Sequence, residues 1–213
     1  MSAAELTTVE IEPQDTAQAA VIWMHGLGAD GNDFKPIIPE LRLPQELGIR
    51  FVFPNAPIRT VTINAGMRMR AWYDIFSVDL PRGEDDAGIR ESEHLIQGLI
   101  RREKKRGIPA DKILLAGFSQ GGAMALHTGL RYPEKLAGIL ALSCYVPLAN
   151  ALAGERHPAN QSIPLFIAHG AMDPVIPAHY GRASVEHLKA LGYQPEWKEY
   201  QAQVVKNAQA MVR

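Results

Sequence analysis

The sequence predicts an α/β fold in which helices cover both faces of a mostly parallel central sheet. Two observations support this prediction: short apolar runs recur along the chain, and stretches with helical periodicity separate them. Most of the runs are apolar nearly throughout rather than alternating, as expected for strands buried on both faces. In chain order, the six runs are AAVIWMHG (19–26), IRFVFPNAP (49–57), KILLAGFS (112–119), AGILALSCY (137–145), IPLFIAHG (163–170) and EWKEY (196–200).

Three helices are expected between these strands. Residues 87–106 place their apolar side chains on one stripe, and Asp85 or Asp86 is available to cap the start. Helices over 120–131 and 178–191 follow the third and fifth runs. Ligands of such sheets bind beyond the carboxyl ends of the strands, so we expect the functional residues at that edge.

The composition excludes several classes of protein. The chain has 213 residues and a formal net charge of −1, which argues against nucleic acid or an anionic membrane as a partner. No apolar run approaches the ~20 residues of a transmembrane segment, and the first residues do not resemble a secretory signal. The single cysteine, Cys144, fits a reducing compartment. We therefore expect one domain over residues 1–213, in the cytoplasm.

Residues 58–86 fit neither a helical nor a strand period and form a long insert. Long loops in compact domains are often functional. One interpretation is a lid whose apolar side chains bind substrate, with Met67, Met69 and Trp72 as the candidates. The other is a surface excursion packed by its own aromatic residues, and the sequence leaves both open.

Ser119 lies where the run ILLAG leads into the predicted helix, with Gly117 and Gly121 on either side. The pattern Gly-x-Ser-x-Gly between a strand and a helix is typical of a nucleophile elbow, a sharp turn that raises the hydroxyl above the sheet. Bulky side chains two positions away would clash in that turn, and glycine avoids the clash. A capping serine at a structural turn is the alternative, but this position favours a nucleophile.

A serine nucleophile needs a base, a carboxylate that orients the base, and N–H groups that stabilise the oxyanion. Asp173 follows a buried strand at the expected edge, although an aspartate before Pro174 also suits a turn. The backbone N–H groups of Gln120, at the head of the helix, and of Leu27, in the loop HGLGADGND, are the expected oxyanion donors. We expect His25 to order that loop rather than to act as the base.

Together these segments resemble the carboxylesterase and acyl-protein thioesterase family of α/β-hydrolases. The resemblance implies that Ser119 is the nucleophile, that Asp173 is the orienting acid, and that Leu27 and Gln120 supply the oxyanion hole. It also implies hydrolysis of small esters or acylated substrates, no cofactor or metal, and a possible homodimer. The matching stretches are VIWMHGLGADGNDF, FVFPNAP, VTINAGMRMRAWYDI, ILLAGFSQGGAMALH, LAGILALSCYVP and IPLFIAHGAMDPVIP.

The resemblance ends at Tyr200. In the family, a Gly-His or Gln-His segment after the last strand carries the base, whereas QAQVVKNAQAMVR follows here and no histidine occurs after His187. The position of the base falls near Gln203 and Val204, and neither side chain accepts a proton at neutral pH. Residues 201–213 are therefore an atypical C-terminus. A shifted reading frame or a premature end in the gene would produce it, and the following DNA would then encode the lost segment in another frame.

Two functions therefore stay open. The first is a serine esterase or thioesterase, with His179 as a candidate replacement base because it follows Asp173 closely. The second is a catalytically impaired hydrolase that binds an acyl ligand or a partner. A cysteine hydrolase is not favoured because Cys144 lies in an apolar run, and no histidine and carboxylate cluster has the spacing of a metal site.

Overall fold

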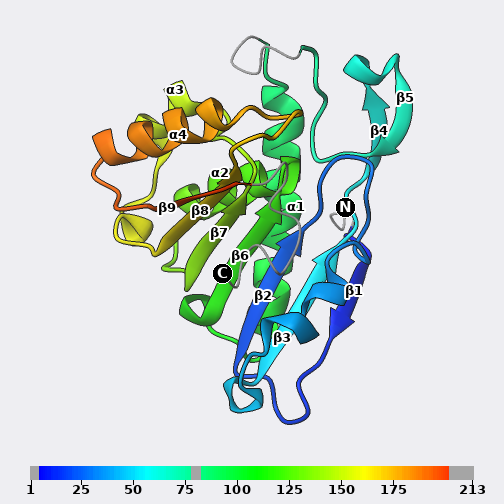
Figure 1. Cartoon of the computed structure of the whole chain (residues 1–213). Coiled ribbons are helices and arrows are strands. Elements are labelled where there is room, and N and C mark those ends of the chain that lie inside the picture. Colours follow the sequence, from blue (N-terminus) through cyan, green and yellow to red (C-terminus); the bar gives the residue numbers. More distant parts are fainter. Residues whose placement is uncertain (1–4, 78–82, 202–213) are drawn as a thin grey trace.

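The computed structural model describes residues 5–77 and 83–201 (Figure 1). Most of the predicted atypical C-terminus, residues 202–213, lies outside this range. The central sheet has seven strands in the order β1-β3-β2-β6-β7-β8-β9. β1 pairs antiparallel with β3, and the other neighbours are parallel. The strands are β1 (Thr8–Ile11), β2 (Ala19–Met24), β3 (Ile49–Pro54), β6 (Ile113–Phe118), β7 (Gly138–Leu142), β8 (Leu165–Gly170) and β9 (Glu196–Tyr200).

All six predicted strands are confirmed, and β1 is an additional strand. β1 has only four residues, TVEI, all half-buried, so it lacks the continuous apolar run that marks a central strand. As an edge strand it pairs with one neighbour alone, and its alternating polar side chains remain at the rim of the sheet.

The described part of the chain has four α-helices. They are α1 (Asp86–Lys105), α2 (Gln120–Arg131), α3 (Ala149–Glu155) and α4 (Ala178–Ala190). The predicted cap of α1 is confirmed, because Asp85 accepts a hydrogen bond from the N–H of Gly88 at 3.0 Å. α3 was not predicted, because its seven residues span too few helical turns to show a periodic pattern of apolar residues. No described helix is long and apolar enough to span a bilayer.

The sequence predicts helices on both faces of the sheet, whereas the described α-helices pack against one face. All four described α-helices contribute to one large core, in which Ile96, Leu126 and Leu188 belong to the same buried cluster as Ile22 and Leu115. The opposite face forms a smaller cluster around Trp23, Phe51 and Phe53. Two 3-10 turns, η1 (Lys35–Ile37) and η2 (Pro39–Leu41), contribute residues to this smaller cluster. The other 3-10 turns of the described chain are η3 (Gln45–Leu47), η4 (Thr62–Asn64), η5 (Ala110–Lys112) and η6 (Pro158–Asn160).

The insert at 58–86 contains a hairpin that the sequence did not predict. β4 (Ile58–Val61) pairs antiparallel with β5 (Met67–Arg70), and Figure 1 shows this pair standing apart from the central sheet. The chain then returns to the body of the protein, where Trp72 is fully buried. Each strand is short and half-exposed, which explains why its pattern was weak. Residues 78–82 of the insert lie outside the described residues.

Candidate active site

Ser119 occupies the turn between β6 and α2 in a strained conformation. Its φ of 53° and ψ of −121° are unusual for a residue with a side chain. The N–H of Ser119 donates to the carbonyl of Leu142 on β7 at 2.8 Å, and its own carbonyl accepts from Ala123 at 3.0 Å. Such strain persists only where the surroundings hold it, and it is common at functional sites. The turn leaves Ser119 half-buried at the carboxyl edge of the sheet.

The two glycines that flank Ser119 are required by close backbone contacts. A Cβ on Gly117 would lie 2.2 Å from the carbonyl oxygen of Gly121. A Cβ on Gly121 would lie 2.3 Å from the carbonyl oxygen of Met24 and 2.6 Å from that of His25. These are backbone atoms, which cannot move aside as a flexible side chain can. The predicted reason for both glycines is therefore confirmed.

Two backbone N–H groups lie near Ser119: that of Gln120, the next residue, and that of Leu27, whose neighbour Gly26 would place a Cβ 3.5 Å from the Cβ of Ser119. Across residues 5–77 and 83–201, neither the N–H of Leu27 nor that of Gln120 is hydrogen-bonded to the protein. The loop that carries Leu27 is held from both ends, because Gly28 donates to the carbonyl of Arg70 at 2.8 Å and Gly31 donates to the Asn55 side chain at 2.9 Å. Two unbonded N–H groups on fixed backbone can stabilise a negative oxygen.

His25 fixes the start of this loop. Its Nε2 accepts a hydrogen bond from the N–H of Ala56 at 3.0 Å, so the proton resides on Nδ1, which donates to the carbonyl of Gly26 at 2.7 Å. Burial lowers the pKa of His25, which keeps the imidazole neutral. Both ring nitrogens are occupied, so His25 orders the loop, as the sequence analysis expected.

The side chain of Gln120 connects the nucleophile turn to the insert. Its Oε1 accepts from the N–H of Trp72 at 2.8 Å, and its Nε2 donates to the carbonyl of Tyr73 at 2.7 Å. The indole N–H of Trp72 donates in turn to the carbonyl of His25 at 2.9 Å. Three segments distant in sequence thereby fix one another around Ser119. Sequence reasoning missed this role of Gln120 and Trp72, and no local pattern signals it.

Asp173 follows β8 and has one constrained carboxylate oxygen and one available oxygen. Oδ1 accepts from the N–H groups of Val175 and Ile176, both at 2.9 Å. Oδ2 lies 3.9 Å from Nε2 of His169, but that nitrogen is 2.7 Å from the carbonyl of Ile176 and bonds there. Asp173 thus forms a turn, and its second oxygen accepts no hydrogen bond from any described residue. This arrangement suits a carboxylate that orients an imidazole.

No histidine bridges Asp173 and Ser119 within the described residues, and Ser119 Oγ has no hydrogen-bond partner there. His179 is exposed, and its ring lies against that of Tyr180 with centroids 4.2 Å apart. His187 is half-buried, and its Nε2 lies 3.0 Å from the carbonyl oxygen of Ala149. His127 is buried against Glu93 at 3.1 Å.

The other expected site residues lie in different surroundings. Met69 is half-buried, and its sulfur would be 3.7 Å from a Cβ on Gly28, so it borders the loop of Leu27. Met67 is 60% exposed at the start of β5. Trp72 has no exposed surface, so in this conformation it offers no contact to a substrate. No group of three or more potential ligands in the described chain could hold a metal ion, and burial raises the pKa of the Cys144 thiol.

The chain matches a family model and is similar in sequence to known proteins. Residues 6–212 match the family model described as phospholipase/carboxylesterase. The acyl-protein thioesterase 1 of Neurospora crassa is 42% identical over 190 residues, which cover 85% of this chain and 78% of that protein. The acyl-protein thioesterase 1 of Gibberella zeae is 38% identical over 208 residues, which cover 94% and 88% of the two chains.

Solved structures agree with these matches. Acyl-protein thioesterase 2 of Zea mays superposes with a TM-score of 0.81 at 30% identity, covering 92% of this chain and 90% of that one. SOBER1 of Arabidopsis thaliana superposes with a TM-score of 0.80 at 30% identity, covering 86% and 89%. The α/β-hydrolase fold expected from the sequence is therefore confirmed.

Proposed function

Because the chain belongs to the phospholipase/carboxylesterase family of carboxylic ester hydrolases, we propose that it attacks carboxylic esters or acyl thioesters with Ser119 as nucleophile. The observation that carries this proposal is the strained turn at Ser119 beside two unbonded N–H groups, those of Leu27 and Gln120. A strained turn requires a stabilising environment, and unbonded donors beside it are suited to an oxyanion.

The proposed reaction follows from these positions. Ser119 Oγ forms a bond to the carbonyl carbon and loses its proton, and the carbonyl oxygen becomes an oxyanion that accepts from Leu27 and Gln120. Collapse of this intermediate breaks the bond to the alcohol or thiol, which leaves with a proton. Water then attacks the acyl-serine and releases the carboxylic acid, which regenerates the hydroxyl of Ser119.

We propose that the proton transfers limit this reaction. Asp173 has a free oxygen to orient an imidazole, but among residues 5–77 and 83–201 no imidazole contacts it except that of His169, which is bonded elsewhere. In this proposal, water or a buffer base takes the proton from Ser119. Enzymes that lose the histidine of a triad keep roughly 10³-fold acceleration over water from the oxyanion hole and binding. Slow turnover is therefore expected.

For the substrate, we propose an acyl chain that lies along the hairpin of β4 and β5. Met69 supports this because it borders the loop of Leu27, and Met67 follows on the same face of β5. Trp72 supports the site from within the core, through its bonds to His25 and Gln120, rather than by touching substrate. The relatives named acyl-protein thioesterase favour an acylated protein or small ester as substrate.

A second function, an impaired hydrolase that binds an acyl ligand or a partner, is favoured by one observation. Ser119 Oγ has no hydrogen-bond partner among the described residues, so nothing there activates it. In that case an acyl compound would bind beside Ser119 and persist without turnover. Incubating the protein with an acyl ester and measuring both its binding and the released acid separates the two functions.

Labelling with a fluorophosphonate probe tests the first proposal, because the probe reacts only with an activated serine. We expect one adduct per chain by intact mass, slow formation, and attachment to Ser119 by peptide mapping. The matched control is Ser119→Ala, which should stay unlabelled, with Ser143→Ala labelled like the wild type. The absence of an adduct, under conditions that label an ordinary serine esterase, would contradict the proposal and support the binding function.

A further inference from the structure

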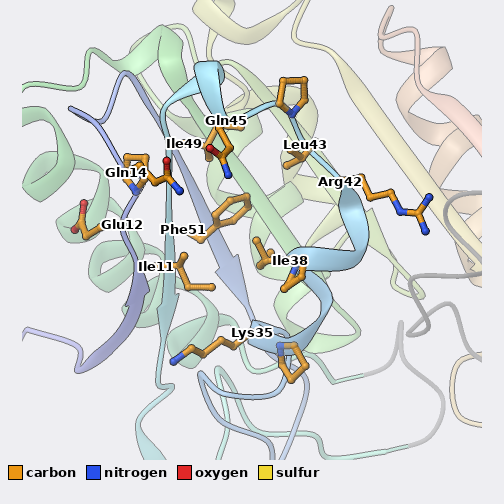
Figure 2. A pocket seen from close by; sticks show the side chains of 14 residues that line it. Ile11, Glu12, Gln14, Lys35, Ile38, Arg42, Leu43, Gln45, Ile49 and Phe51 are labelled. Carbon is orange, nitrogen blue, oxygen red and sulfur yellow. The ribbon is translucent and has the colours of Figure 1, made fainter.

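A groove unrelated to Ser119 lies between β3, the end of β1 and the turns η1 to η3. It has a volume of about 660 Å³, within the range typical of small-molecule sites. Figure 2 shows Phe51 at its centre, with Ile11 and Ile38 beside it and Ile49 and Leu43 toward one end. The groove borders the smaller core cluster, and β2 separates β3 from the strand that leads to Ser119.

The groove exposes apolar surface that the described residues leave uncovered. Leu43 is 42% exposed, and Ile11, Ile38 and Ile49 are half-buried. Its outer wall is built from proline-containing turns, and two residues with positive φ, Arg42 at 48° and Gly48 at 53°, end η2 and η3. Prolines and such caps restrict the backbone, so the wall is preformed rather than shaped by a ligand.

The rim of the groove has an excess of positive charge. Lys35 and Arg42 are exposed, and neither forms an ion pair within the described chain. Glu12 is the one acidic side chain in the lining, and its carboxylate is paired with Arg50 at 2.9 Å and Arg106 at 2.7 Å. The negative charge is thus balanced, whereas both positive charges are available to an anion.

We propose that this groove is a second binding site, which takes a long-chain carboxylic acid. Figure 2 shows Lys35 at one end, apolar side chains between, and Gln14 and Gln45 at the other end. An anionic head at Lys35 with a methylene chain over Phe51 matches this order of charge and apolar surface. The apolar floor provides no set of donors and acceptors to recognise a polar ring. Hydrolysis at Ser119 would release such an acid, but the proposal stands without that reaction.

Displacement of a fluorescent fatty acid tests the site in the full chain. We would use dansyl-labelled undecanoic acid and the variant Ser119→Ala, so that no probe or competitor is consumed. Dodecanoate should displace the probe, and dodecanol should be a weaker competitor because it lacks the charge. Binding should also weaken with added salt, since the Lys35 ammonium is exposed. If dodecanol competes as well as dodecanoate, the proposed recognition of a carboxylate is wrong.

Matched variants locate the site. Leu43→Asp should weaken binding by about tenfold, whereas Leu47→Asp, a leucine 47% exposed on η3 but outside the groove, should not. Lys35→Glu should weaken it by about fivefold, with the exposed Lys112→Glu as control. Thermal unfolding confirms that each variant folds.

Three results would overturn the proposal. Equal effects of Leu43→Asp and Leu47→Asp would exclude the groove. Loss of binding in Met69→Asp alone would place the acid beside Ser119 instead. A dimer in sedimentation velocity that Leu43→Asp dissociates would show that a second copy of the chain occupies the groove. None of these measurements uses the chemistry of Ser119, so failure here and failure of the proposed hydrolase are distinguishable.

Discussion

On the β2 side of Ser119, four hydrogen bonds join the loop of Leu27, the side chain of Gln120 and the segment around Trp72 into one unit. On the β8 side, Asp173 is held by two backbone N–H groups and presents a free oxygen, but no described side chain links it to Ser119. The proposed oxyanion side is backbone that several segments fix, so the fold determines it. A base would be one side chain from one segment, so a chain without it would keep the rest of the proposed site in place.

The largest expected effect comes from Gly121→Ala, which would test how tightly the oxyanion side is built. Its Cβ would lie 2.3 Å from the carbonyl oxygen of Met24, so β2 and α2 would have to separate. We expect a loss of about 3 kcal/mol or more in the free energy of unfolding, together with loss of labelling at Ser119. Urea denaturation measures the free energy of unfolding.

The matched control is Gly154→Ala in α3, where no atom lies within 4 Å of the added Cβ. It should change the stability by less than about 1 kcal/mol, because alanine suits a helix. If Gly121→Ala were as stable as Gly154→Ala, the close contact between β2 and α2 would not constrain the turn.

The second prediction is that Gln120→Leu slows fluorophosphonate labelling by about tenfold or more. The substitution leaves the N–H of Trp72 and the carbonyl of Tyr73 buried without partners, so the segment shifts and displaces the oxyanion donors. Gln161→Leu is the control, because that amide also makes two hydrogen bonds but lies far from Ser119 in the fold. Slower labelling in both variants would mean a general loss of stability instead.

A smaller effect is expected from Met69→Ala, which probes the acyl side of the site. Shortening this side chain beside Gly28 should change the ratio of rates for short and long acyl esters by about fivefold, the lower end of the ~1–3 kcal/mol that a methylene contact contributes. Met67→Ala, at an exposed position further along β5, should change the ratio less. Unchanged ratios in both variants would exclude the hairpin as the acyl surface.

The smallest effect concerns pH. Burial lowers the pKa of His25 in the folded protein, so the unfolded chain binds the proton more readily. The stability from neutral His25 is therefore fully present above its unfolded pKa of about 6.5 and is lost as the pH falls below that value. His127, whose pKa is also lowered by burial, adds to the same trend. Urea denaturation between pH 7.5 and 5 should show this slope, and His25→Asn should reduce it; an unchanged slope would contradict it.

The sequence predicted the parts of the fold that depend on local pattern. The run KILLAGFS and the following helix were recognisable because continuous apolar residues mark a buried strand, and Gly117 and Gly121 identify the turn between them. The strands β1, β4 and β5 were missed because each has four residues and lies at an edge or in a separate pair. Their pairing depends on neighbours that no local pattern reveals.

The candidate site also divides into residues that a local sequence pattern predicts and contacts that depend on distant parts of the fold. Ser119 and Asp173 were predictable from their positions after strands. The turn interpretation of Asp173 is confirmed, because its Oδ1 accepts from two backbone N–H groups, and its role as the orienting acid stays a prediction. The burial of Trp72 was not predictable, because its indole bonds to His25 across the fold. An aromatic residue in a long insert signals apolar contact, and the sequence alone cannot say whether that contact is substrate or core.

The most direct test of the proposal that the site lacks a base is the rate of fluorophosphonate labelling as imidazole is added. If the space between Asp173 and Ser119 lacks only an imidazole, the rate should rise with imidazole concentration in the wild type, rise less in Asp173→Ala, and stay at zero in Ser119→Ala. Rapid labelling that imidazole does not change would contradict this account. It would show that the chain already supplies a base, and His179→Ala would then be the variant to measure.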